Sequence, residues 1–116
     1  MPYLFVVSMD VAPEKEALFN EVYDDEHVPF LLKVPGVRRV TRAKSVPLTV
    51  TIGGERKESP AASPAYTAIY EVESPDVLAS PEWAAAVEQG RWAGEVRPHT
   101  FNRGHALYEA TGVQGG

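Results

Sequence analysis

The segment from Tyr3 to Val11 constrains the fold more than any other part of the sequence. Its odd-numbered residues are all apolar, and the even-numbered residues Leu4 and Val6 are apolar as well. This composition predicts a strand, and a strand that is apolar on both sides needs cover on both faces. Helices of a small domain can cover one face of the sheet, which leaves the other face as a large apolar patch. We therefore predict a homodimer in which the bare sheet faces of two copies pack together.

Proline and turn signals divide the rest of the chain into alternating helices and strands. Pro13 suits the start of a helix to about Asp25, and Pro29 predicts a break or kink near Glu26–Val28 before a last helical piece. The further predicted elements are strands at Val37–Ser45, Tyr66–Glu73 and Thr100–Glu109 and a helix at Pro81–Gln89. The order β-α-β-β-α-β predicts an α+β, ferredoxin-like fold, with a four-stranded antiparallel sheet and two helices on one face.

Length and composition favour one small domain and exclude several classes of function. We assign residues 1–110 of the 116 to a single ferredoxin-like domain, with Val46–Pro64 as an insert or loop and residues 111–116 as a flexible tail. The net charge of −5 argues against nucleic acid as a partner. The longest apolar stretch near the start is far shorter than a membrane span, and no signal peptide is evident, so we expect a cytoplasmic protein without membrane contact.

His27 is the leading candidate for a catalytic residue. It falls at the predicted helix break beside Asp24, Asp25 and Glu26, and a histidine titrates near neutral pH, as general acid/base catalysis requires. The neighbouring carboxylates are expected to raise its pKa unless burial outweighs them. The alternative is a structural histidine that caps the broken helix by bonding a backbone carbonyl.

Other aromatic and basic residues are candidates for the lining of a pocket. Tyr23, Trp83 and Trp92 combine flat rings with polar atoms, which suits a site for a ring-shaped ligand but also suits a core. Arg103 and His105 are predicted to share a strand face with Phe101 and Leu107, either as a pocket wall or as an exposed face.

The sequence gives little support for a bound metal ion or cofactor. Cysteine is absent, which removes thiolate nucleophiles and cysteine-based metal sites. His99 and His105 would lie about 20 Å apart along a regular strand, too far to bind one ion together. We expect no cofactor and no metal.

Two segments carry a resemblance to a known family. Residues Val22 to Arg39 resemble the signature of EthD-like proteins: an aromatic-acidic helix end, a histidine, a proline two residues later, and a Pro-Gly pair that opens a strand. Residues Tyr66 to Trp83 look like the second half found in uncharacterised relatives. The resemblance implies a dimeric α/β barrel, a group that includes cofactor-independent monooxygenases, polyketide cyclases, isomerases and proteins with no known reaction.

Together with the candidate residues, this resemblance leads to two hypotheses about function. In the first, a small homodimer binds an aromatic or polyketide-like organic molecule at His27 and transforms it by acid/base chemistry without a cofactor. In the second, the chain is a non-enzymatic ligand-binding or accessory protein. An open cavity that reaches His27 would favour the first hypothesis, and a filled core would favour the accessory protein.

Overall fold

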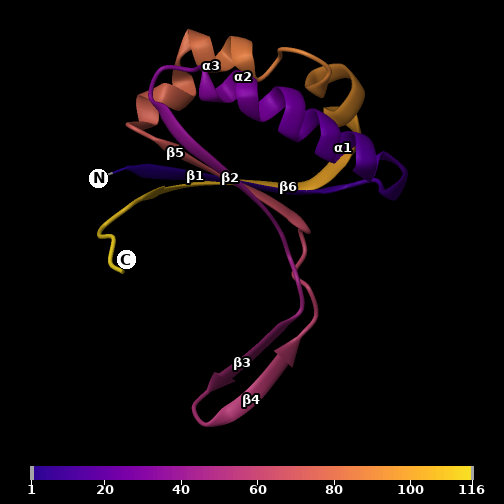
Figure 1. Ribbon diagram of the computed structural model, residues 1–116, viewed down its shortest axis with the longest axis vertical. Coiled ribbons are helices and arrows are strands. Elements are labelled where there is room, and N and C mark those ends of the chain that lie inside the picture. Colours follow the sequence, from indigo (N-terminus) through magenta and orange to yellow (C-terminus); the bar gives the residue numbers. More distant parts are fainter. Residues whose placement is uncertain (1, 116) are drawn as a thin grey trace.

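The computed structural model describes residues 2–115 as a sheet covered on one face by helices (Figure 1). Its main sheet has the antiparallel order β2-β5-β1-β6. The strands are β1 (Tyr3–Val11), β2 (Val37–Lys44), β5 (Tyr66–Val72) and β6 (Thr100–Glu109). This confirms the predicted ferredoxin-like fold of the α+β class.

The first connection is a continuous helical segment and not a broken helix. It consists of η1 (Pro13–Lys15), α1 (Glu16–Val22), η2 (Tyr23–His27) and α2 (Val28–Leu32). The segment η2 is a π-helical turn in which the Val28 N–H donates to the Tyr23 carbonyl five residues earlier. Of the predicted break or kink at Glu26–Val28, the break is wrong. The helix continues through a wider turn, which accommodates Pro29 although it has no N–H to donate.

The second helical connection also contains a π-helical turn. It consists of η3 (Pro75–Ala79), α3 (Pro81–Ala86), η4 (Trp92–Val96) and η5 (Arg97–His99). The segment η4 is also a π-helical turn, with the Arg97 N–H donating to the Trp92 carbonyl just before Pro98. Each helical connection thus contains a π turn that ends two residues before a proline.

The core lies between these helices and one face of the sheet. Alternate residues of β5 are buried there, and Val7 and Met9 of β1 join them. Phe19, Val22 and Leu31 of the first helical connection pack against this face with exposures of at most 1%. Burial of each such side chain contributes about 1.5–3 kcal/mol, so this layer accounts for the position of the helices over the sheet.

The opposite face of the sheet is open, with no helix of the described chain over it (Figure 1). Strand register places apolar residues together there: Leu4 pairs with Tyr108, and Val6 pairs with both Ile69 and Ala106. We call these five residues the open face. Tyr108 is 57% exposed, which is unusual for so large a ring.

Strands β3 (Leu48–Ile52) and β4 (Glu55–Ser59) form a separate hairpin, here called the arm. The arm projects from the ends of β2 and β5 on the side of the sheet away from the helices (Figure 1). The radius of gyration is 16.0 Å, whereas a compact chain of this length has about 13 Å. The arm accounts for the difference. Within residues 2–115 no helix has the length and apolar character needed to cross a membrane.

Candidate functional site

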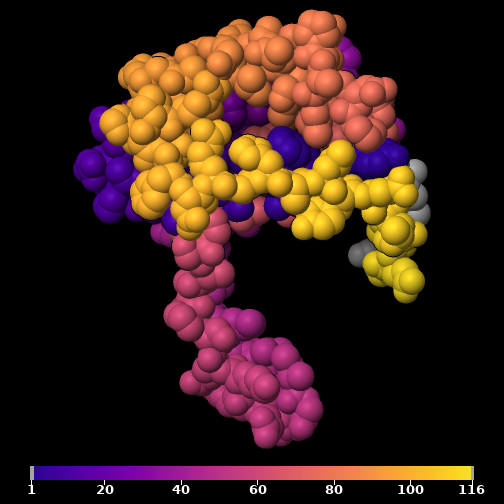
Figure 2. Space-filling view, turned by 180° about the vertical axis from the view of Figure 1, so that it is seen from behind, coloured from indigo at the N-terminus to yellow at the C-terminus, as the bar shows by residue number. Residues whose placement is uncertain are grey.

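A pocket of about 120 Å³ lies between the helical layer and the sheet. Its mouth lies on the side shown in Figure 2, between the orange helical segment and the yellow strand β6. The lining residues come from both helical connections and from three strands: Phe5, Val7, Met9, Tyr23, His27, Leu31, Tyr70, Trp83, Val87, Trp92, Arg97, Arg103 and His105. The structure thus brings all six sequence-predicted site residues to one pocket.

His27 lies where the two π turns meet. It ends η2 and is 5% exposed, and its ring stacks on that of Trp92 from η4, with centroids 4.4 Å apart and planes 20° apart. Tyr23 meets the same imidazole edge-on at 5.2 Å. The Nδ1 atom of His27 is buried without a hydrogen-bond partner among the residues described. The alternative of a capping histidine is therefore not seen within residues 2–115, because Nδ1 bonds no backbone carbonyl and the His27 side chain makes no capping hydrogen bond to α2.

Burial, and not the adjacent carboxylates, controls the protonation of His27. Burial, with a smaller contribution from the positive charge of Arg97, lowers the pKa of the imidazole from 6.5 to about 4, and the Glu88 carboxylate opposes this shift. Burial thus outweighs the upward shift expected from the acidic neighbours, whose side chains are turned away from the ring. Asp24 is exposed and lies 2.7 Å from Arg42, and Glu26 binds Arg91 at 2.5 Å. At neutral pH the His27 ring is therefore uncharged.

Tyr23 and Tyr70 form a buried pair of hydroxyl groups in the pocket wall. Their oxygens are 2.9 Å apart, and burial raises the pKa of both phenols. Both are therefore protonated, so the pair has two hydrogens and uses one of them in the shared bond. The other hydrogen has no acceptor among residues 2–115. Tyr70, whose sequence position favours the core over a pocket, is both a core residue and part of the pocket wall.

Trp83, Arg103 and His105 complete the wall near the mouth. Trp83 meets the rings of Phe5 and Tyr70 edge-on at 5.9 and 5.6 Å. The imidazole of His105 stacks on Phe5 at 5.8 Å. Arg103 is exposed, and it makes no hydrogen bond or ion pair with any residue that the structure describes.

The predicted common face of Phe101 and His105 is wrong. Asn102 has a φ of +53°, and the register of β6 against β1 shifts beside it. After this irregularity Phe101 pairs with Asp10, while His105 pairs with Val7. Since Asp10 and Val7 point to opposite faces of β1, Phe101 lies on the opposite side of the sheet from the pocket.

Arg97 is a pocket residue that sequence reasoning missed. Its guanidinium binds the Glu88 carboxylate and donates to the Val87 carbonyl at 2.9 Å, so its charge is both held and balanced. The signal for it is a spacing that occurs twice, an aromatic residue followed at three and six positions by glutamate and proline. It occurs at Tyr23–Pro29 and at Trp92–Pro98, and each occurrence contains one of the two π turns.

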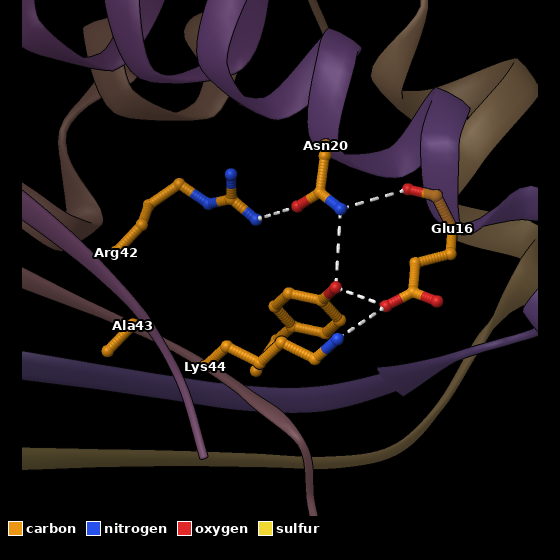
Figure 3. Close-up of a pocket in the computed structure, with 6 residues that line it drawn as sticks. Glu16, Asn20, Arg42, Ala43 and Lys44 are labelled. Carbon is orange, nitrogen blue, oxygen red and sulfur yellow. Dashed lines mark hydrogen bonds and ion pairs between the residues drawn. The ribbon is translucent and has the colours of Figure 1, made fainter. Parts of the chain in front are cut away.

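A larger hollow of about 540 Å³ lies on the surface between α1 and β2 (Figure 3). Its polar groups satisfy one another. Glu16 accepts from Lys44 at 3.1 Å and also from the Tyr66 hydroxyl, while Asn20 donates to Tyr66 at 3.2 Å and accepts from Arg42 at 2.9 Å. Because this network leaves no buried group in need of a partner, we consider it structural and the His27 pocket the candidate site.

Comparisons with solved structures support the fold. An EthD family protein from Bacillus halodurans matches with a TM-score of 0.58 and 16% identity, over 95% of this chain and 99% of that chain. A mutant of MhuD with two manganese protoporphyrin IX molecules bound per active site matches with a TM-score of 0.63 and 16% identity, over 99% of this chain and 100% of that one.

Sequence comparison adds no further assignment. No family model matches the chain, and no curated protein matches it significantly. Within residues 2–115 no group of three or more His, Asp or Glu side chains is arranged to hold a metal ion. The chain therefore has the ferredoxin-like fold of an EthD family protein and of MhuD, the fold that its resemblance to EthD-like proteins implies.

Proposed function

We propose that this protein is a homodimer in which each copy binds a small aromatic molecule in the His27 pocket. The observation that carries the proposal is the buried imidazole of His27, which stacks on Trp92 and leaves Nδ1 without a partner in the described structure. An unpaired buried polar group costs about 1–3 kcal/mol. Groups of this kind are typical of sites where a ligand completes the interactions.

The size of the pocket sets the size of the ligand. Its volume is about 120 Å³, and an engineered apolar cavity of about 150 Å³ in another protein is known to hold benzene. Sites for drug-sized molecules have about 300–1,000 Å³. We therefore infer a single aromatic ring, or the ring end of a polyketide-like molecule. The porphyrin bound to MhuD is not transferred to this chain, because it is far too large for this cavity.

The protonation of His27 favours binding over catalysis. An imidazole with a pKa of about 4 is uncharged at neutral pH, so it cannot act as a general acid there. It is also a weak base, because a general base works best when its pKa lies near the working pH. The cavity at His27 supports the ligand binding of the first hypothesis, whereas the low pKa of His27 counts against its acid/base step. A ligand-binding protein is thus the better-supported function, and a cofactor-independent monooxygenase, cyclase or isomerase is the alternative.

The open face supports the homodimer. Leu4, Val6 and Ile69 lie together on the sheet face that no helix of residues 2–115 covers, and Tyr108 lies beside them largely exposed. A contiguous apolar surface of this kind marks an interaction site in a soluble protein. When a second copy packs against it with the same face, the open faces of both copies are buried.

Calorimetric titration with phenol tests the binding proposal. We expect phenol to bind the wild-type protein with a millimolar or lower Kd, and His27→Ala to weaken this binding at least tenfold while the circular dichroism spectrum is retained. His99→Ala is the matched control, since His99 lies in η5 outside the pocket lining. Equal affinity in wild type and His27→Ala, or no binding to the wild type, contradicts the proposal.

A further inference from the structure

We propose that the ligand of the His27 pocket is an anion, specifically a single-ring aromatic carboxylate. This inference rests on the proposed function and adds the charge of the ligand to it. Its basis is an imbalance in the pocket, where the polar side chains supply hydrogen-bond donors and none of the described lining residues is Asp, Glu, Asn or Gln.

The donors in the wall are available to a ligand. The Tyr23–Tyr70 pair has one hydroxyl hydrogen left after the bond between the two oxygens. A neutral imidazole also has one N–H, and the buried Nδ1 of His27 has no hydrogen-bond partner within residues 2–115. A ligand rich in acceptor oxygens accepts from both of these hydrogens, whereas a ligand that only donates leaves both without an acceptor.

Arg103 adds a positive charge that the protein itself does not balance. The chain has seven arginines, and six of them form salt bridges with carboxylates: Arg38, Arg39, Arg42, Arg56, Arg91 and Arg97. Within residues 2–115 Arg103 forms none, although the chain carries more Asp and Glu than Lys and Arg. The exception stands at the mouth of the pocket.

A carboxylate on an aromatic ring matches this arrangement. The ring suits the walls formed by Trp92, Trp83 and Phe5, and the carboxylate suits the mouth, where a guanidinium can pair with both of its oxygens. Arg97 is less suited to this role, because Glu88 already occupies its guanidinium.

Benzoate and benzamide provide the test, because they have nearly the same size and differ in charge. By calorimetry on the full chain at pH 7 we expect benzoate to bind at least tenfold more tightly than benzamide. Arg103→Gln should weaken benzoate binding about tenfold and leave benzamide binding unchanged. Arg38→Gln is the control, since Arg38 lies on β2 and pairs with Glu73 away from the pocket.

The outcomes separate this inference from the proposed function. Equal affinities for benzoate and benzamide, or an unchanged benzoate affinity in Arg103→Gln, overturn the anionic ligand while leaving a binding pocket. Binding of phenol without binding of benzoate has the same meaning. If phenol, benzoate and benzamide all fail to bind, the proposed function and this inference both fail.

From a separate observation we infer that the arm packs against the second copy of the chain in the dimer. All its strand residues except Val50 are exposed, with exposed fractions of 53% for Leu48 and 57% for Ile52. An isolated two-stranded hairpin is at best marginally stable in water. Alternation along β3 places Leu48, Val50 and Ile52 on one face of the arm and Thr49 and Thr51 on the other. The arm thus has one apolar stripe to cover.

A second copy of the chain is the occupant that the geometry favours. The arm leaves the sheet on the same side as the open face, and it continues from β2 and β5, which belong to that sheet (Figure 1). A copy packed on the open face therefore lies beside the arm as well. In a two-fold dimer the contact is made twice, since each arm reaches the other copy.

Sedimentation of variants tests the role of the arm. We expect Leu48→Ser with Ile52→Ser to raise the dimer Kd at least tenfold, and Thr49→Ser with Thr51→Ser on the other face to leave it unchanged. An unchanged Kd in the first variant, or the same Kd when a tetrapeptide replaces residues 48–59, overturns the role of the arm and leaves the dimer. If the wild-type protein is a monomer at micromolar concentration, the proposed dimer and the role of the arm are both contradicted.

Discussion

We expect the free energy of unfolding to decrease as the pH is lowered, and we attribute a large part of this decrease to one residue, His27. In the folded chain burial holds its pKa at about 4, while in the unfolded chain an accessible histidine has a pKa near 6.5. Between pH 4 and pH 6.5, His27 is mostly protonated in the unfolded chain and mostly neutral in the folded chain. Lower pH therefore favours unfolding. The stabilising contribution is complete above pH 6.5, decreases as the pH falls towards 4, and changes no further below 4.

The expected magnitude follows from the same two pKa values. Linkage gives a loss of about 1.4 kcal/mol at pH 5.5 and about 2.5 kcal/mol at pH 4.5, relative to neutral pH. This loss is a large fraction of the free energy of unfolding of a typical domain, which is about 5–15 kcal/mol. Carboxylates with lowered pKa, such as Glu16, Glu26 and Glu88, add their own losses at the acid end of this range. A variant that removes only the imidazole separates the two effects.

His27→Gln is that variant, since glutamine is polar and does not titrate. Urea unfolding followed by circular dichroism at pH 7.5, 6.5, 5.5 and 4.5, at fixed protein concentration, gives the free energy of unfolding of each protein. We expect the wild type to lose about 2.5 kcal/mol more than His27→Gln between pH 7.5 and 4.5. His105→Gln, a change to an exposed ring, should keep the wild-type slope. Equal slopes for wild type and His27→Gln would refute the buried, neutral imidazole.

Two further predictions concern the local structure that supports the pocket. Gly90→Ala should lower the melting temperature by several degrees, because φ at Gly90 is +73° and a Cβ would stand 2.6 Å from Glu26 Oε1. Gly94→Ala, with open space around it, should change the melting temperature little, and a similar loss in both variants would count against the steric argument. Ser80→Ala should destabilise by about 1 kcal/mol in urea, since its hydroxyl accepts the capping hydrogen bond of α3 at 3.1 Å. Ser74→Ala removes no such bond and should have a smaller effect; a larger effect there would contradict the capping role.

The sequence predicts the sheet well because strand burial has a short period. Alternate residues from Tyr66 to Val72 are buried against the helices, as the alternation of apolar residues indicates. The irregularity at Asn102 cannot be predicted from the alternation of apolar residues. A single residue in the left-handed region is enough to move Phe101 to the other face of the sheet. A regular period cannot reveal where the strand departs from it.

The helical turns and the chemistry of His27 are harder to predict for physical reasons. Proline normally indicates a helix break, and π turns are too rare to be expected from a single proline. Neighbours in sequence also point in different directions around a helix, so Asp24 and Asp25 face solvent while His27 faces the core. The groups that do act on His27, Arg97 and Glu88, are distant in sequence and come near only through the fold.

The most direct test of an aromatic ligand at His27 is the NMR spectrum of the two tryptophan indole N–H groups. The chain has two tryptophans, Trp83 and Trp92, and both line the pocket. We predict that adding benzoate shifts both indole signals along one saturable curve, because a ring in the pocket lies against both side chains. Indole signals that stay in place, or drift linearly without saturation up to millimolar benzoate, would contradict an anionic aromatic ligand; if phenol leaves both signals equally unmoved, the aromatic pocket is contradicted as well.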